Sequence, residues 1–336
     1  MDLSEEIYSD AVQYCFPSLN SSCLKEQSTV KKAMLYFLIS GLIMMTLGGN
    51  ITVIIAIAHF RQLHTPTNFL ILSLALDDFL IGAIVMPFSM ISAVENCWYF
   101  GDTFCYLSAS FFTALTVISI FHLIFIAVDR YFAICDPLHY SRKITNSVAG
   151  IFIVVSWVVP QIYAYSYVFS HAEIVTSKSS CTGSCVLTWT ALSSTVDAFV
   201  SFFIPCSVML CLYAKVFLVA KRHSEMLIHI EISQQRTSSS QQHESKAAKT
   251  LTIVMGVYLL CWLPIVIVSL ADPYINYSTP VMLYKCLVWL AFSNSAYNPI
   301  IYAFFYPWFQ KALKLIATGK IFTSESCSMK LVSEHS

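Results

Sequence analysis

The sequence has few charged residues: Asp, Glu, Lys and Arg make up 11% of its 336 residues, whereas a soluble domain carries about 25%. It also lacks an excess of either sign, because 19 Lys and Arg face 19 Asp and Glu, so a nucleic-acid partner is not expected. Disorder is excluded, since 57% of the residues are hydrophobic and 14% are aromatic. With a mean hydropathy of +0.68, the chain cannot cover its core with polar surface, so lipid must match the apolar excess.

The first 32 residues lack the basic start and the apolar run of a cleavable signal peptide. They carry Asp2, Glu5, Glu6 and Asp10 instead. We therefore expect residues 1–32 to be an extracellular N-terminal segment, and the first apolar stretch to direct membrane insertion itself.

Nearly uncharged stretches long enough to cross a bilayer, which takes about 20 residues, recur along the chain. Backbone amides in hydrocarbon must be paired within their own segment, so we expect helices. The predicted fold is an all-α membrane protein, with a seven-transmembrane-helix bundle over residues 33–309 and a short amphipathic eighth helix with a cytoplasmic tail over residues 310–336. The seven stretches are 33–58, 68–94, 104–128, 145–170, 184–214, 250–271 and 286–309.

The positive charges predict the orientation. Only Lys25, Lys31, Lys32, Lys178 and Lys285 fall on the side of the N-terminus, so this side is predicted to be extracellular in a multi-pass protein of the plasma membrane. The sequon at Asn20 then lies outside and is a predicted glycosylation site. Residues 308–316 form the amphipathic pattern that predicts a helix along the inner membrane surface. Beyond it, Cys327 is either a palmitoylation site or a free tail cysteine.

Six of the 12 cysteines fall on the outer side, where oxidation can occur. A metal site at Cys181 and Cys185 is disfavoured, because no partner pair stands at zinc spacing. Disulfides that tether the second outer loop are the favoured interpretation. The six are Cys15, Cys23, Cys97, Cys105, Cys181 and Cys185.

Acidic residues within the predicted membrane segments are candidate functional residues, because each costs about 2.5 to 3.5 kcal/mol to insert. Asp129 is followed by Arg130, which compensates its charge. Asp77 and Asp78 are adjacent, about 100° apart on a helix, so both cannot face one cavity. Asp78 is predicted to join a polar cluster that either binds a sodium ion or is a hydrogen-bond network without one; no other cofactor or metal is expected. The other members are Ser119, Asn294, Ser295 and Asn298.

Asp197 lies in the outer half of the fifth segment, and no Lys or Arg occurs at comparable depth. An unpaired carboxylate there favours an external cation; the alternative is a neutral or internally hydrogen-bonded aspartate. Aromatic residues at the same level would suit an organic ammonium through burial and cation–π attraction. They are Phe111, Phe112, Phe199, Trp262 and Phe292.

Ordered motifs along the membrane region resemble those of the rhodopsin-like G-protein-coupled receptors. They are Gly49-Asn50, Leu74-Ala75-Leu76-Asp77-Asp78, Asp129-Arg130-Tyr131, Trp157, Pro205, Cys261-Trp262-Leu263-Pro264 and Asn298-Pro299-Ile300-Ile301-Tyr302. Within that class, three runs are similar to those of the trace amine-associated receptors, above all the one that begins at Asn298. They are His64-Thr65-Pro66-Thr67-Asn68, Cys97-Trp98-Tyr99-Phe100-Gly101 and Asn298 through Phe309.

This resemblance implies a receptor for small amines that activates a stimulatory heterotrimeric G protein, raises cyclic AMP and acts in the cilia of olfactory sensory neurons. It also implies a disulfide between Cys105 and Cys185, and a second from the N-terminal segment to Cys181. Cys23 is favoured for the second because it follows the sequon, and Cys15 stays open.

The chain departs from the family at the amine-binding aspartate of the third helix. That position, seven residues after Cys105 and 18 before Arg130, is Phe112, and the tyrosine of the seventh helix that usually bonds it is Phe292. A subset of fish members uses an acid in the fifth helix, where Asp197 stands eight residues before Pro205. The predicted site therefore pairs a protonated amine with Asp197. The residues expected around the rest of the ligand are Phe112, Thr113, Thr116, Ser201, Trp262, Ile265, Val266, Ser269 and Phe292.

The resemblance also implies an activation switch, with Ile120, Pro205, Tyr258 and Trp262 in the packing core. Arg130, between Asp129 and Tyr131, is expected to pair with Glu244 in an ionic lock, while Tyr213 and Tyr302 pack inward on activation.

Other functions remain open. A receptor that has lost amine binding would sense an uncharged or lipid-like ligand, with Asp197 structural. A membrane transporter or channel is the alternative of another class, although the sequence shows no internal repeat or paired broken helices. An enzyme is not expected, because no metal-ligand cluster or set of nucleophile and base is apparent.

Overall fold

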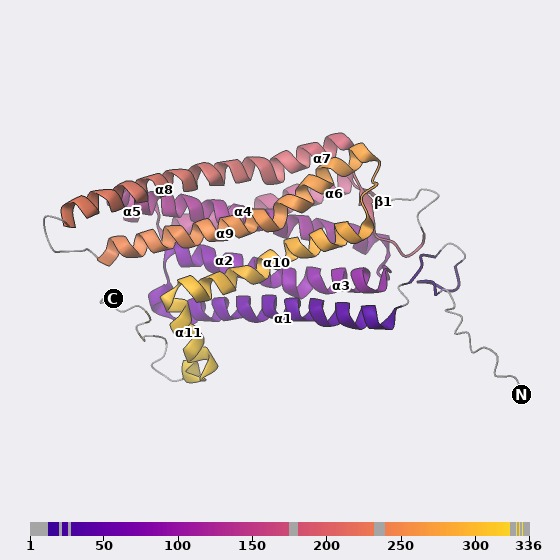
Figure 1. The fold of residues 1–336 in the computed structure, drawn as a ribbon, viewed down its shortest axis with the longest axis horizontal. Coiled ribbons are helices and arrows are strands. Elements are labelled where there is room, and N and C mark those ends of the chain that lie inside the picture. Colours follow the sequence, from indigo (N-terminus) through magenta and orange to yellow (C-terminus); the bar gives the residue numbers. More distant parts are fainter. Residues whose placement is uncertain are drawn as a thin grey trace, which may run out of the picture.

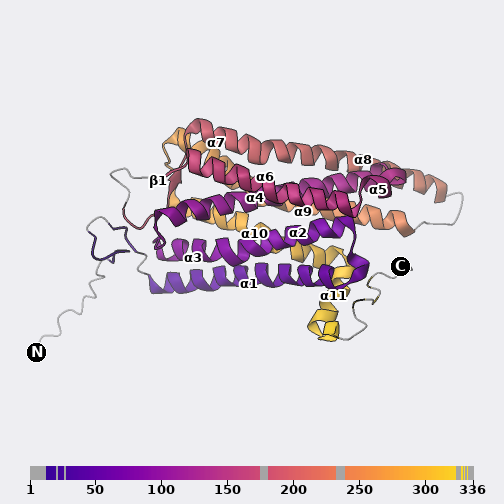
Figure 2. The same ribbon diagram turned by 180° about the vertical axis from the view of Figure 1, so that it is seen from behind.

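The long helices lie side by side along one axis, with β1 at one end of the bundle and α11 at the other (Figures 1 and 2). The structure is a computed structural model that describes residues 13–19, 22–25, 28–174, 181–231, 239–322, 327, 329 and 331. The side chains of residues 220, 223–231, 239–249, 251 and 322 are outside this description. The predicted glycosylation site Asn20 also lies outside the described residues.

The bundle is built from helices and from helices continued through π-helical turns. They are α1 (Thr29–His59), α2 (Pro66–Leu80) with η2 (Ile81–Val85) and α3 (Met86–Glu95), α4 (Gly101–Cys135), α6 (Asn146–His171), α7 (Ala191–Asp197) with η3 (Ala198–Phe203) and α8 (Ile204–Glu231), α9 (Ser239–Ala271) and α10 (Val281–Phe305). The connecting elements are η1 (Arg61–Leu63), α5 (Pro137–Lys143), η4 (Asp272–Ile275), α11 (Pro307–Ala317), η5 (Lys320–Phe322) and the antiparallel pair of β1 (Glu173–Ile174) and β2 (Leu187–Thr188).

Within the described residues, six helices are long and apolar enough to cross a membrane. Helix α10 is not among them, although its 25 residues exceed the roughly 20 that a bilayer core needs. Its polar residues Asn294, Ser295 and Asn298 are each at most 4% exposed, so they face the other helices rather than lipid. Helix α10 therefore completes the predicted bundle of seven.

Most helices extend past the stretches that the sequence predicted, and two ends lie inside those stretches for a local reason. The fifth was expected from residue 184, but α7 begins at Ala191, because the Thr190 side chain accepts a hydrogen bond from the Ser193 amide and caps the helix. The seventh was expected to reach residue 309, but α10 ends at Phe305 and Pro307 starts α11, since proline is favoured at a first helical turn.

The burial pattern is that of a bundle in lipid. Phe37, Leu192 and Leu260 are 80%, 75% and 74% exposed, while the polar side chains of Asn50 and Asp78 are fully buried. Close helix contact depends on Gly49, where a Cβ would lie 2.9 Å from the ring of Pro299. Apolar residues thus face outward and polar residues face the core, as expected where the solvent is hydrocarbon.

Three disulfides fasten the end of the bundle at which α1 and α4 begin. Cys105–Cys185 and Cys23–Cys181 are the two that the family resemblance implies. The third, Cys15–Cys97, was not predicted, and it shows that Cys15 pairs with the loop between α3 and α4 rather than with Cys181. Gly183 is needed beside it: its φ is +100°, and a Cβ there would lie 3.1 Å from that of Cys15.

Candidate functional site

Asp197 is the last residue of α7, directly before the π-helical turn η3, and is only partly exposed. Turns of this kind inside helices often occur at functional sites. Its Oδ1 accepts a 2.6 Å hydrogen bond from the Tyr163 hydroxyl on α6. The expectation of an unpaired carboxylate therefore needs a correction: the group has a neutral partner. Among the described residues, none forms an ion pair with it.

A stack of aromatic rings leads from Asp197 toward the outer end of the bundle. The rings of Tyr163 and Tyr167 are 5.9 Å apart and within 8° of parallel, and those of Tyr167 and Trp189 are 6.3 Å apart and within 4°. The Tyr167 hydroxyl donates to the backbone carbonyl of Ser193 at 3.3 Å. This stack holds α6 against α7 and fixes the position of Tyr163.

The apolar residues of the predicted site contact one another. The Phe112 ring lies 6.1 Å from that of Trp262 and 5.3 Å from that of Phe292, and Ile265 is buried in the same core. Phe199, in contrast, is 51% exposed and so points away from this core, contrary to expectation.

The polar members of the predicted site are Thr113, Thr116, Ser201 and Ser269, which with Val266 are half-buried. The Thr116 hydroxyl donates to the Phe112 carbonyl at 2.9 Å, and the Ser201 hydroxyl to the Asp197 carbonyl at 2.7 Å. Turn η3 contacts both α4, which carries Phe112, and α9, which carries Trp262. The candidate site is thus an acid at the α6–α7 junction beside an apolar core.

The two adjacent acids of α2 reach different helices. Asn298 on α10 donates to Oδ2 of Asp78 at 2.8 Å. Ser119 on α4, which was expected beside Asp78, donates instead to Oδ2 of Asp77 at 2.6 Å. The Oδ1 atoms of both acids and Nδ2 of Asn294 are buried and have no hydrogen-bond partner among the residues that the structure describes. Ser295 accepts through its backbone carbonyl, to which Asn50 donates at 2.9 Å.

At the end of the bundle near α5, Arg130 forms an ion pair with the preceding residue, Asp129. Its Nη2 lies 2.5 Å from Oδ2 of Asp129, which also accepts from the Thr67 hydroxyl, while Tyr140 donates to Oδ1 at 2.8 Å. The predicted partner Glu244 is on α9, but its side chain lies outside the described residues.

The residues of the predicted packing switch share one core. Tyr258 and Trp262 have ring centroids 6.1 Å apart, and Ile120 is fully buried. Tyr213 and Tyr302 belong to the same cluster nearer the inner end, whereas Tyr131 packs in a small separate cluster. Pro205 is the second residue of α8, which follows η3 directly.

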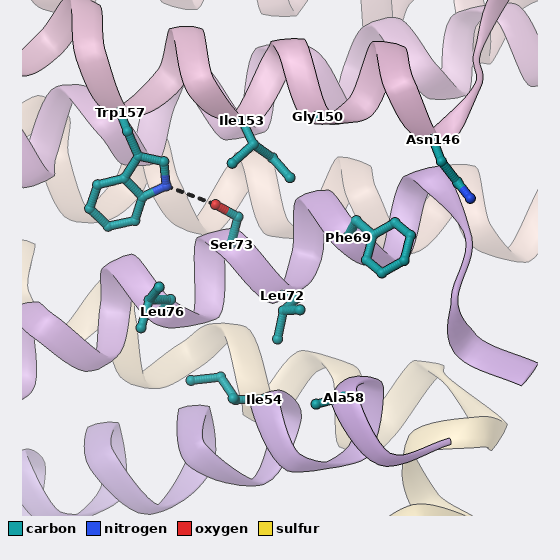
Figure 3. A pocket seen from close by; sticks show the side chains of 10 residues that line it. All are labelled: Ile54, Ala58, Phe69, Leu72, Ser73, Leu76, Asn146, Gly150, Ile153 and Trp157. Atoms are coloured by element: carbon teal, nitrogen blue, oxygen red, sulfur yellow. Dashed lines mark hydrogen bonds between the residues drawn. The ribbon is translucent and has the colours of Figure 1, made fainter. Parts of the chain in front are cut away.

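A cavity of about 440 Å³ lies elsewhere, between α1, α2 and α6 (Figure 3). Its polar side chains include Asn146 and Ser73; the Trp157 indole donates a 2.9 Å hydrogen bond to the Ser73 hydroxyl, and His122 Nε2 also lies 2.8 Å from that hydroxyl. None of the predicted ligand-binding residues lines it, so this cavity is not the predicted amine site. The lining residues are Ile54, Ala58, Phe69, Leu72, Ser73, Leu76, Asn146, Gly150, Ile153 and Trp157.

Several contacts were missed by the sequence analysis. Nothing in the sequence singles out Tyr163, one of 18 tyrosines, as the partner of Asp197. A signal for Cys97 did exist: six outer cysteines are an even number, which favours complete pairing.

Comparison with known proteins agrees with this architecture. Residues 49–302 match the family described as 7 transmembrane receptor (rhodopsin family). The chain is 48% identical to trace amine-associated receptor 13c of Danio rerio, over 98% of this chain and 99% of that protein. It is 46% identical to trace amine-associated receptor 4 of Mus musculus, over 97% of each chain, and 43% identical to trace amine-associated receptor 1 of Homo sapiens, over 96% of this chain and 98% of that protein.

Proposed function

Because the chain belongs to the trace amine-associated receptors of the rhodopsin family, we propose that it is a receptor for small protonated amines that binds the ammonium group at Asp197. Members of this family are receptors and not enzymes. The rest of the ligand packs toward Phe112, Trp262 and Phe292.

This proposal rests on the location of the Asp197 carboxylate and on its lack of a positively charged partner among the described residues. It lies within a membrane-spanning segment, is partly exposed, and has no ion-pair partner among the described residues. The hydrogen bond from Tyr163 orients this carboxylate without neutralising it, because a phenol hydroxyl carries no charge. A ligand ammonium supplies the missing positive charge.

The signalling part of the proposal rests on the family and on the charge bias of the loops. The N-terminus lies outside the cell, the protein lies in the plasma membrane of olfactory cilia, and its partner is a stimulatory G protein that raises cyclic AMP. Ligand binding shifts α9 at Pro264 through Trp262 and Tyr258, which releases Arg130. Asp78, which accepts from Asn298, would hold a sodium ion, whose charge would balance the buried carboxylate and so stabilise the inactive state.

The experiment measures cyclic AMP accumulation in response to a panel of volatile amines. Asp197→Asn keeps the size of the side chain and its ability to accept from Tyr163 but removes the charge. We expect it to abolish responses while surface expression stays normal. Retained responses in this variant would contradict amine binding at Asp197.

The Tyr163 hydrogen bond also favours a second candidate, a receptor of the same family for an uncharged ligand with Asp197 as a structural residue. Raising the pH separates the two, because a protonated amine then loses its charge and an uncharged ligand does not change. A response that falls as the amine is deprotonated supports the amine receptor, and a constant response supports the alternative.

A further inference from the structure

We propose that the connection between α9 and α10 is a lid over the amine site, and that Tyr277 is the residue that holds this lid closed. The Tyr277 hydroxyl bonds both backbone groups of Trp189: it accepts from the amide at 2.9 Å and donates to the carbonyl. This inference rests on the proposed function, because it concerns how a ligand reaches Asp197.

Trp189 is the outer end of the ring stack that leads to Asp197. Its indole lies on Tyr167, which lies on Tyr163, and Tyr163 donates to the carboxylate. In both ribbon views, the α9–α10 connection lies beside β1 and the start of α7 (Figures 1 and 2). A ligand that arrives from outside and binds Asp197 has to pass this end of the bundle.

Two further contacts hold the same side of the bundle closed. The hydroxyls of Tyr274 and Thr195 form a 3.0 Å hydrogen bond, and the Ser194 hydroxyl donates to the Ser269 carbonyl of α9 at 2.9 Å. The three disulfides fasten the other outer segments, whereas residues 272–280 contain no cysteine. The contacts that close the lid are therefore hydrogen bonds, which can break and form again.

The lid is closed against the preference of its own backbone. Asn276 and Tyr277 have φ angles of 55° and 54°, in the left-handed region. This conformation is unfavourable for a tyrosine, and it persists only where surrounding contacts hold it, often at clamps and switch regions. The contacts here are the hydroxyl bonds to Trp189 and a 2.9 Å bond from the Tyr277 amide to the Asp272 carbonyl. Loss of the hydroxyl bonds therefore favours the open lid.

The described form leaves little access for a ligand. Trp262 and Phe292, toward which the ligand packs in the proposed function, are 7% and 2% exposed. Tyr277 is 41% exposed and is not one of these contacts. A lid that opens to admit a ligand, and closes without touching it, changes the association and dissociation rate constants by the same factor. The affinity, which is their ratio, then stays the same.

The test measures binding kinetics by stopped-flow tryptophan fluorescence. The purified full-length receptor in lipid nanodiscs is mixed with cyclohexylamine, isopentylamine or 2-phenylethylamine. Tyr277→Phe keeps the ring and removes both bonds to Trp189, so we expect both rate constants to rise about tenfold, with a dissociation constant within about twofold of the wild type. Tyr274→Phe loses one bond and should raise both rate constants about threefold.

Tyr99→Phe is the matched control. Tyr99 is 39% exposed at the same end of the bundle, and its ring contacts Phe16. It lies on the loop between α3 and α4, which the Cys15–Cys97 disulfide fastens. We expect this variant to keep the rate constants of the wild type.

The outcomes separate this inference from the proposed function. If none of the three amines binds the wild type at millimolar concentration, or Asp197→Asn binds them with unchanged affinity, the proposed function fails and the lid with it. If Asp197→Asn abolishes binding but Tyr277→Phe leaves the rate constants unchanged, or lowers the affinity without faster association, only the lid is overturned. Equal acceleration in Tyr99→Phe overturns the lid as well.

Discussion

The side-chain amide of Asn298 on α10 donates a 2.8 Å hydrogen bond to Asp78 on α2 across the core of the bundle. The adjacent Asp77 takes its hydrogen bond from Ser119 on α4 instead. Two neighbouring acids therefore join α2 to two different helices. Within the described part of the chain, Oδ1 of each acid is buried without a hydrogen-bond partner, so either acid has an oxygen that could bind an ion.

The first prediction concerns sodium. If Asp78 binds the ion, replacing sodium by a large organic cation should raise agonist affinity several-fold in the wild type, because the ion stabilises the inactive state. Asp78→Asn should remove this dependence, measured by agonist competition binding. Asp77→Asn is the matched control and should keep it. The reverse pattern would assign the ion to Asp77.

The second prediction concerns Arg130, which pairs with a fully buried Asp129. Asp129→Asn keeps the shape but leaves the guanidinium without its counter-charge, a loss of about 3–5 kcal/mol for a buried pair. We expect basal cyclic AMP to rise several-fold at equal surface expression. Tyr140→Phe removes one neutral donor to Asp129, worth about 1 kcal/mol, and should raise it much less. Unchanged basal signalling in Asp129→Asn would show that this pair does not hold the receptor inactive.

The third prediction tests whether Phe112 and Asp197 face one cavity. Phe112→Asp places a second acid on α4, and we expect potency for α,ω-diamines of suitable length to rise at least about tenfold, that is about 1.4 kcal/mol. Phe112→Asn is the control, since it loses the same ring contacts with Trp262 and Phe292 without adding a charge. The measurement is a dose-response series over diamines of increasing length. Equal profiles for the two variants would place the two positions in separate spaces.

The fourth prediction concerns the two disulfides of the N-terminal segment. Cys15→Ser and Cys23→Ser should each lower the unfolding temperature modestly, because the other bond still tethers residues 13–25. The double variant should lose more stability than the two single variants together, because neither bond then holds the N-terminal segment. One crosslink typically contributes about 2–4 kcal/mol. Cys327→Ser, which removes a free cysteine, is the control and should have no effect. Additive losses would mean that the two tethers act independently.

The helices were predictable because membrane insertion imposes one strong rule, a long uncharged run, and the chain follows it. Helix ends were less predictable, since local chemistry sets them. Thr190 caps α7, which begins seven residues after the start of the apolar run, and α10 ends before the run does because Pro307 starts α11. The hydropathy pattern indicates neither the cap at Thr190 nor the break before Pro307.

The site was predictable only in part. The absence of the third-helix acid and the position of Asp197 are visible in the sequence, because they depend on residue identity and spacing. The Tyr163 hydrogen bond depends on how α6 and α7 face each other, and the π-helical turn η3 directly after Asp197 changes the rotation of the helix by adding a residue to the turn. In the same way, whether Ser119 bonds Asp77 or Asp78 depends on the rotation of α2 about its axis, which residue spacing alone does not define.

Cys15 and Cys23 are bonded to different outer loops, to Cys97 and Cys181, and a third bond joins Cys105 to Cys185. The end of the bundle at which α1 and α4 begin is therefore covalently braced, and the N-terminal segment cannot swing away from these loops without breaking a disulfide. We therefore expect larger movements of the helices at the opposite end, where hydrogen bonds such as that from Thr67 to Asp129 join them. The disulfide-bonded end is therefore the fixed end of the bundle.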